Sequence, residues 1–135
     1  MQAVGSIQYI AVVTRRDLAF AAHALARHVA GSTKKHELAV QHVMRYLQST
    51  IDVGLTFNGL GNEDVVDVFS DANSVSTKSV SGMVLRIYGN CVFWRSKGQE
   101  IIAGDTTEAE LIVMSRATYV LIWAKQLCSD LSLKA

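Results

Sequence analysis

The sequence predicts an α/β protein in which an antiparallel sheet packs against one long helix and is preceded by N-terminal helices. Three observations support this fold class. Up to about residue 50, apolar residues recur at helical spacing. From residue 53 to residue 95, short apolar runs alternate with turns rich in glycine and asparagine, which is typical of strands joined by hairpins. From about residue 105 to 131, one uninterrupted apolar segment is too long for a strand and predicts a helix.

The first half of the chain, residues 1–50, predicts a helical segment with helices at 3–13, at 17–30 and after residue 33. Gly31 follows the second helix as a stop signal, and Ser32 or Thr33 caps the third. The apolar faces of the second and third helices are formed by Leu18, Ala21, Ala22, Leu25 and Val29, and by Leu38, Val40, Val43, Met44 and Leu47.

The second half, residues 51–135, predicts a domain of short strands followed by the long helix. Residues 58–62 supply the turn after the first strand, and Gly89 with Asn90 predicts a tight hairpin. The predicted strands cover residues 53–57, 65–70, 80–88 and 91–95.

Composition limits the possible functions. With 135 residues, 50% of them hydrophobic and 19% charged, the chain can build a modest core and is not a disordered tail. A net charge of +1 predicts no general attraction to nucleic acid, so such binding requires a local patch. Cys91 and Cys128 lack metal-ligand spacing, which favours buried free thiols in a reducing compartment over a disulfide. The N-terminal apolar run is too short to span a bilayer and has no secretory pattern, so we expect a soluble intracellular protein.

Two acids stand where predicted elements end or begin. Asp71 closes a predicted strand, and Glu110 lies in the first turn of the long helix. A helical wheel aligns Glu110 with Met114 on the apolar face, whereas Glu108 points closer to solvent. A strand-end Asp facing an early-helix Glu is an arrangement that holds divalent cations, because these cations prefer oxygen ligands.

A second interpretation of these acids stays open. Thr107 with Glu110, or Asp105 with Glu108, has the spacing of a capping box that satisfies free amides at a helix start. Asp71 likewise begins the sequence Asp-Ala-Asn-Ser, which is typical of a turn.

A series of short stretches along the chain indicates a family. They are AVGSIQYIA (3–11), TRRDLAFA (14–21), AVQHVMRYL (39–47), GLTF (54–57), FSDA (69–72), SVSG (79–82), WRSKGQ (94–99) and TEAE (107–110). In this order they resemble the end of the reverse transcriptase connection and the ribonuclease H (RNase H) domain of copia-type LTR retrotransposon polyproteins. The resemblance covers nearly the whole chain.

The resemblance implies a truncated RNase H-like fold and metal-dependent hydrolysis of the RNA strand in an RNA–DNA hybrid. It assigns Asp71 and Glu110 as catalytic, metal-binding residues of a two-metal site for Mg²⁺ or Mn²⁺. It also implies a cytoplasmic location or a location in a virus-like particle.

The departures from the family pattern concern the same site. Asn73 and Ser74 stand where the family has a second Asp and a Trp, and the family's third metal-binding Asp follows the long helix, beyond Ala135. We therefore expect the chain alone to be weak or inactive as a nuclease. The alternative is a non-catalytic binding or oligomerising module, a remnant of the retroelement.

Two expectations about partners complete the sequence analysis. Lys97 is the best candidate for contacts to nucleic-acid phosphates, because it flanks the sheet edge near the acids, and Arg95 is a second candidate; the alternative for these basic residues is a solvated face. The strand at 65–70 would lack a partner on one edge, which predicts a homodimer unless residues 53–57 fold back to cover that edge.

The four histidines lack the spacing of a helical zinc pair.

Overall fold

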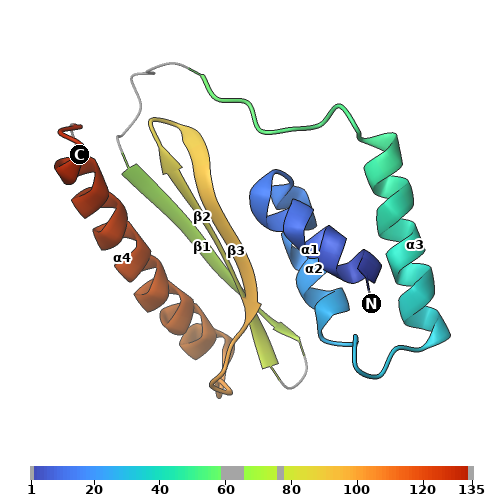
Figure 1. Ribbon diagram of the computed structural model, residues 1–135. Coiled ribbons are helices and arrows are strands. Elements are labelled where there is room, and N and C mark those ends of the chain that lie inside the picture. Colours follow the sequence, from blue (N-terminus) through green and yellow to red (C-terminus); the bar gives the residue numbers. More distant parts are fainter. Residues whose placement is uncertain (1, 59–65, 76–77, 134–135) are drawn as a thin grey trace. The chain divides into compact units, whose positions relative to one another are not determined.

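The computed structural model describes residues 2–58, 66–75 and 78–133. The chain divides into two compact units, Met1–Leu55 and Thr56–Ala135. The first contains only helices, and the second contains a sheet with one long helix against it (Figure 1).

The first unit packs three α-helices around an aliphatic core. They are α1 (Gln2–Val13), α2 (Ala19–Ala26), which the short 3₁₀ helix η1 (Arg16–Leu18) precedes, and α3 (Lys34–Ser49). The buried core residues are Val4, Ile7, Ala11, Leu18, Ala22, Leu25 and Val43.

Two details of these helices differ from the prediction. The second helix ends at Ala26 rather than at residue 30, because the N–H of His28 bonds to Leu25 O, three residues back, and tightens the chain into a turn. The predicted face of α3 is only partly buried: Leu38 and Met44 are half exposed, whereas Val40 and Leu47 pack against the core. The cap predicted at Thr33 is confirmed.

The second unit is a three-stranded antiparallel sheet with α4 (Thr106–Asp130) packed on β1 and β2. The strands are β1 (Val66–Val75), β2 (Lys78–Ile87) and β3 (Asn90–Gly98), in the order β1-β2-β3. Figure 1 shows α4 along one side of this sheet. The mixed helix-and-sheet class, the antiparallel sheet and the long C-terminal helix are thus confirmed.

The strand boundaries correct three predictions. Residues 53–57 form no strand, and Asn58 instead exchanges hydrogen bonds with Asn90 at the β2–β3 turn, so this segment does not cover β1. The ladder of β1 continues to Val75, which places Asp71 inside the strand rather than at its end. The hairpin turn is Tyr88–Gly89 rather than Gly89–Asn90, since both residues have positive φ angles of 50° and 76°.

The buried face of α4 also differs from the predicted wheel. The prediction placed Glu110 and Met114 on the packing face, but both are exposed, and Met114 retains 59% of its accessible surface. Ala117, Ala124 and Cys128 of the predicted line are buried, so the face that contacts the sheet is turned toward Ala109 and Val113 by only about half of the ~100° step between neighbouring residues. It consists of Ala109, Val113, Ala117, Ala124 and Cys128.

Candidate functional site

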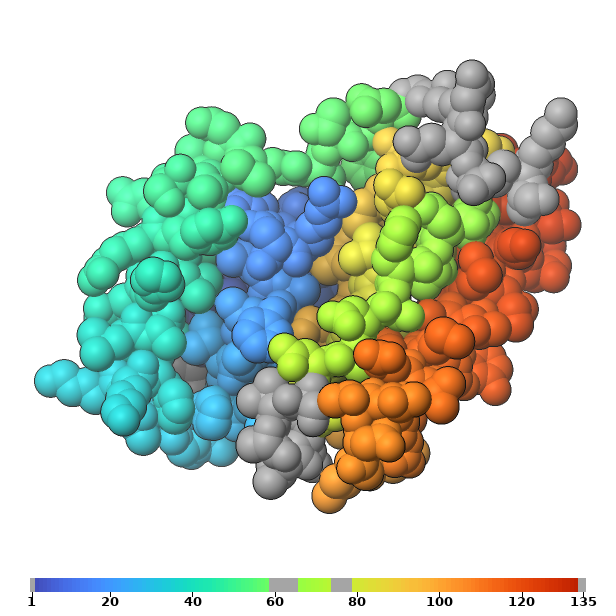
Figure 2. Space-filling view, turned by 180° about the vertical axis from the view of Figure 1, so that it is seen from behind, coloured from blue at the N-terminus to red at the C-terminus, as the bar shows by residue number. Residues whose placement is uncertain are grey.

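Asp71 lies on the edge strand of the described sheet. It pairs with Gly82 of β2 on one side, while β1 has no neighbour on the other side among the described strands. The side chain is exposed. Figure 2 shows β1 (yellow-green) at the molecular surface alongside α4 (orange to red).

A buried glutamine fixes the first turn of α4 at the level of Asp71. Gln99 is 1% exposed, and its Nε2 donates to Ser81 Oγ and to Ala109 O, both at 2.9 Å. Ser81 pairs with Ala72, the residue after Asp71. The start of α4, with Glu110 next to Ala109, therefore lies over the part of the sheet that contains Asp71.

The two acids nevertheless belong to opposite faces of the sheet. Side chains alternate along a strand, so Asp71 shares a face with Phe69 and Asp67, both of which contact Arg86. The other face of the sheet is buried and carries Ser81. Because Gln99 bonds both to Ser81 and to Ala109 of α4, this is the face that α4 covers. The carboxylates of Asp71 and Glu110 can consequently approach each other only around the open edge of β1.

The capping alternatives are resolved by the hydrogen bonds at the start of α4. Asp105 Oδ1 accepts from the N–H of Glu108 at 2.7 Å, and Glu108 Oε2 accepts from the N–H of Gly104 at 2.6 Å. Asp105 and Glu108 thus form the cap, and Glu110 takes no part in it. The turn interpretation of Asp71 is wrong as well, because the strand ladder includes the residues that follow it.

The donor set is smaller than a two-metal site requires. Within residues 2–58, 66–75 and 78–133, no group of three His, Cys, Asp or Glu side chains could hold a metal ion. Two carboxylates would leave most of the six ligands of Mg²⁺ to water. The residues present fit part of a metal site, and we derive no hydrolytic step from them.

Arg95 and Lys97 lie on β3, two strands away from Asp71. Lys97 pairs with Ser81 and Arg95 with Met83, so both belong to the face that α4 covers over β1 and β2. Lys97 Nζ also bonds Glu100 Oε1 at 2.7 Å.

The charges around Glu100 identify a residue that sequence reasoning missed. The hydrogen bond from Lys97 lowers the pKa of the Glu100 carboxyl, and the charges of Lys97, Arg116 and Arg95 lower it further. Arg116 comes from the third turn of α4. Its electrostatic effect on Glu100 depends on how α4 lies on the sheet, so no local sequence signal could have revealed it.

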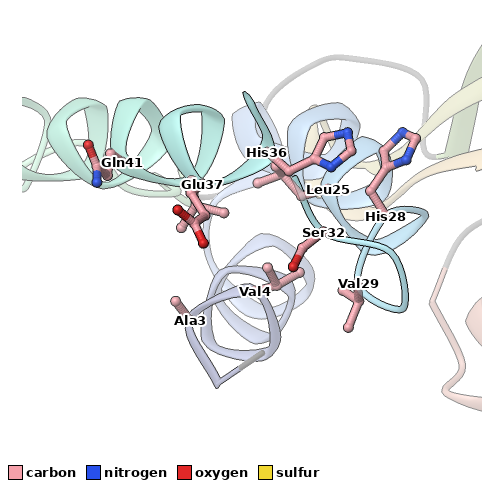
Figure 3. A pocket seen from close by; sticks show the side chains of 10 residues that line it. Ala3, Val4, Leu25, His28, Val29, Ser32, His36, Glu37 and Gln41 are labelled. Carbon is pink, nitrogen blue, oxygen red and sulfur yellow. The ribbon is translucent and has the colours of Figure 1, made fainter. Parts of the chain in front are cut away.

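The first unit has a pocket of about 340 Å³ between α1 and the ends of α2 and α3 (Figure 3). His28 and His36 stack at its side, with ring centroids 4.2 Å apart. His36 Nδ1 accepts the N–H of Thr33 at 3.1 Å, so its role is to cap α3. A stacked, capping imidazole is unsuited to bind a metal through the same nitrogen. None of the described helices combines the length and the apolar run that a membrane span needs.

No family model matches the chain, and no solved structure matches it. Among curated proteins, it is 40% identical over 127 residues to the secreted RxLR effector protein 161 of Plasmopara viticola, covering 91% of the chain and 89% of that protein. It is 33% identical over 135 residues to the retrovirus-related Pol polyprotein from transposon TNT 1-94 of Nicotiana tabacum. The corresponding polyprotein from transposon RE2 of Arabidopsis thaliana is 31% identical over the same length.

The matches to the polyproteins cover 97% of the chain but only 10% and 9% of the polyproteins themselves. The retroelement origin predicted from the ordered motifs is therefore confirmed at the level of the polyprotein. The chain belongs to the family that includes the effector protein 161 of Plasmopara viticola, and it is homologous to a segment of the retrovirus-related Pol polyproteins of plant transposons.

Proposed function

We propose that the second unit is a retroelement-derived RNase H-like domain that holds part of a divalent-metal site and does not cleave nucleic acid by itself. Asp71 and Glu110 are its two metal-binding acids, and Mg²⁺ or Mn²⁺ is the ion. The observation that carries this proposal is that both acids are exposed at one level of the sheet, with Asp71 on one face of the edge strand β1 and Glu110 on the helix that covers the other face.

The open edge explains how such a site could be completed. Another strand that pairs with β1 would satisfy its free N–H and C=O groups and would bring its own side chains between Asp71 and Glu110. A third carboxylate there would add the ligand that two-metal hydrolysis of an RNA–DNA hybrid needs. In this chain the two acids bind a cation weakly, because most of its ligands stay water.

Cleavage of a labelled RNA–DNA hybrid in Mg²⁺ and in Mn²⁺ tests the proposal. We expect no cleavage by this chain. We expect cleavage by a chain extended at its C-terminus with the segment that follows the matched region in one of the Pol polyproteins. Asp71→Asn should abolish that activity, whereas Asp52→Asn, which changes an exposed acid in the turn after α3, should leave it unchanged.

Two outcomes would contradict the proposal. Metal-dependent cleavage by the unextended chain, lost in Asp71→Asn, would show that two acids suffice. Activity of the extended chain that survives Asp71→Asn would show that Asp71 is not a ligand.

A second candidate function is a non-catalytic binding or oligomerising module. The supporting observation is that the chain aligns with nearly all of a relative that is itself named as an effector rather than as a polyprotein. A homodimer formed by pairing of two β1 edges would satisfy the backbone groups that β1 leaves open. Sedimentation at tens of micromolar tests this function, and a monomer at that concentration would exclude edge pairing.

A further inference from the structure

The face of β3 on the α4 side is only partly covered, since α4 packs mainly on β1 and β2: Arg95 is exposed, and Phe93 and Lys97 are partly exposed. On β2 the corresponding face is buried, and Leu85 and Met83 are 0% and 7% exposed. Across from Met83 on β3 stands the exposed Arg95, and Lys97 follows on the same face. A partly open strip of sheet thus runs beside α4 with two cations on it.

The flank of α4 beside this strip carries a third cation and two exposed aromatic rings. Gln99, the residue after β3, donates from Nε2 to Ala109 O at 2.9 Å, and Arg116 follows Ala109 by two helical turns, so it lies on the same flank of α4 as this bond. Consistent with this position, the charge of Arg116 helps to lower the pKa of the Glu100 carboxyl. Tyr119 and Trp123 follow Arg116 by three and seven residues and so lie on the same flank. Tyr119 is 72% exposed and Trp123 is 56% exposed.

We propose that these five residues, Arg95, Lys97, Arg116, Tyr119 and Trp123, form a binding surface for single-stranded nucleic acid. We call them the basic–aromatic flank. Aromatic rings next to cations bind a single strand because bases stack on the rings while phosphates contact the cations. A duplex is disfavoured, since its bases are already stacked on each other and offer no free face.

The dimensions of the flank fit a short stretch of one strand. From Arg116 to Trp123 the helix rises about 10.5 Å at about 1.5 Å per residue. Stacked nucleotides are about 3.4 Å apart along one strand, so the flank accommodates about three of them. Glu100 is an acid beside this cluster, and its carboxylate forms an ion pair with Lys97. A phosphate that binds Lys97 must displace Glu100.

A substitution of Glu100 tests the proposal through an expected increase in affinity for the single strand. Glu100→Gln removes the competing charge and should tighten binding of a fluorescein-labelled 12-nucleotide oligouridylate, measured by anisotropy at low salt, by about twofold or more. The double variant Arg95→Glu, Arg116→Glu should weaken binding at least tenfold. Lys125→Glu, which makes half of that charge change at an exposed residue of another part of α4, should weaken binding less than twofold.

The aromatic contribution has its own matched pair. Trp123→Ala should weaken binding about fivefold or more, as loss of one stacked base does. Met114→Ala, which truncates a similarly exposed side chain on another flank of α4, should have little effect. Circular dichroism of each variant establishes that it remains folded.

Salt dependence measures the number of phosphates bound. With about three phosphates contacted, the logarithm of affinity should fall with the logarithm of salt at a slope of about −2. The proposal is overturned if Lys125→Glu weakens binding as much as the double variant, or if Glu100→Gln leaves affinity unchanged. Equal affinity for polyglutamate or for a duplex of the same length would overturn it too, the former because it would identify an acidic polypeptide as the ligand.

This surface is independent of the proposed metal site. Asp71→Asn should bind the oligouridylate as tightly as the unmodified chain, because Asp71 lies on the opposite face of the sheet. Failure of one proposal therefore leaves the other standing.

Discussion

Replacing Asp17 by Asn should destabilise the helical unit, because Asp17 neutralises a buried arginine. Arg15 is 5% exposed and donates to both carboxylate oxygens of Asp17, from Nε at 3.0 Å and from Nη2 at 2.8 Å. The same guanidinium donates to Thr50 O at 2.9 Å and to Thr50 Oγ1 at 2.7 Å, which joins the segment before η1 to the end of α3. Tyr46 OH adds a third bond to Asp17, at 2.9 Å.

The magnitude follows from the burial of the two partners. Breaking a fully buried ion pair costs about 3–5 kcal/mol. The Asp17 side chain is 30% exposed and Arg15 keeps its bonds to Thr50, so the cost should be smaller. We expect Asp17→Asn to lower the free energy of unfolding by about 2–3 kcal/mol, the contribution of about one charged hydrogen bond. In a unit of this size that corresponds to a fall in Tm of about 10 °C or more.

The same residue gives the helical unit a dependence on pH. The hydrogen bond from Arg15 lowers the pKa of the Asp17 carboxyl below its value in the unfolded chain. The carboxylate therefore stabilises the folded unit fully above about pH 4, and this contribution is lost as the pH falls through the folded pKa. Asp17→Asn lacks this contribution at every pH.

Hydrogen exchange measured by mass spectrometry can detect this change in the helical unit. Peptides from α1, α2 and α3 should exchange faster in Asp17→Asn at neutral pH, and the difference from the unmodified chain should shrink as the pH falls below about 4. Tryptophan fluorescence is unsuitable, since Trp94 and Trp123 both lie in the second unit. Asp52→Asn is the matched control. Unchanged protection of the helical peptides in Asp17→Asn would refute the reasoning.

Three further substitutions test local features of the fold through urea unfolding. Gly89→Ala should destabilise the β2–β3 hairpin by about 1 kcal/mol, because the φ angle of 76° disfavours a side chain. Gly5→Ala should instead stabilise α1 by up to about 1 kcal/mol, since a Cβ there meets nothing within 4 Å. Gln99→Met should cost about 1–2 kcal/mol by leaving Ser81 and Ala109 without their shared donor, with exposed Gln126→Met as control. The explanations for Gly5 and Gln99 would be contradicted if Gly5→Ala lowered the free energy of unfolding, or if Gln99→Met lowered it no more than Gln126→Met does.

The parts of the fold that sequence predicted well are those with local causes. The prediction of α4 at about 105–131 agrees with Thr106–Asp130, because Asp105 caps the helix through a bond to a residue three positions away. The β2–β3 hairpin was predicted to within one residue from its glycine.

The parts that sequence predicted poorly depend on distant partners. Residues 53–57 alternate as a strand does, yet they form no strand, because a strand requires a neighbour to pair with. The turn-forming sequence at Asp71 is overridden by pairing with β2. The packing face of α4 was predicted only in part: Ala117, Ala124 and Cys128 are buried, but Glu110 and Met114 are not, because apolar residues surround much of that helix and its periodicity does not select one face sharply.

The candidate site likewise contains residues that local motifs predicted and residues whose roles depend on distant packing. Asp71 and Glu110 were identified from short motifs, and the structure brings their backbones to the same level of the sheet. Gln99, which fixes that level, and Arg116, whose charge acts on Glu100 together with those of Lys97 and Arg95, were not identified, since their positions are set by the packing of α4.

The most direct test of the central claim is the pattern of NMR line broadening caused by Mn²⁺. At millimolar Mn²⁺ we expect the amide signals of Asp71, of Gly82 opposite it and of Glu110 to broaden first. Asp71→Asn should remove this broadening, whereas Asp52→Asn should preserve it. Broadening centred elsewhere, or broadening at Glu110 that persists unchanged in Asp71→Asn, would show that the two acids do not share a cation.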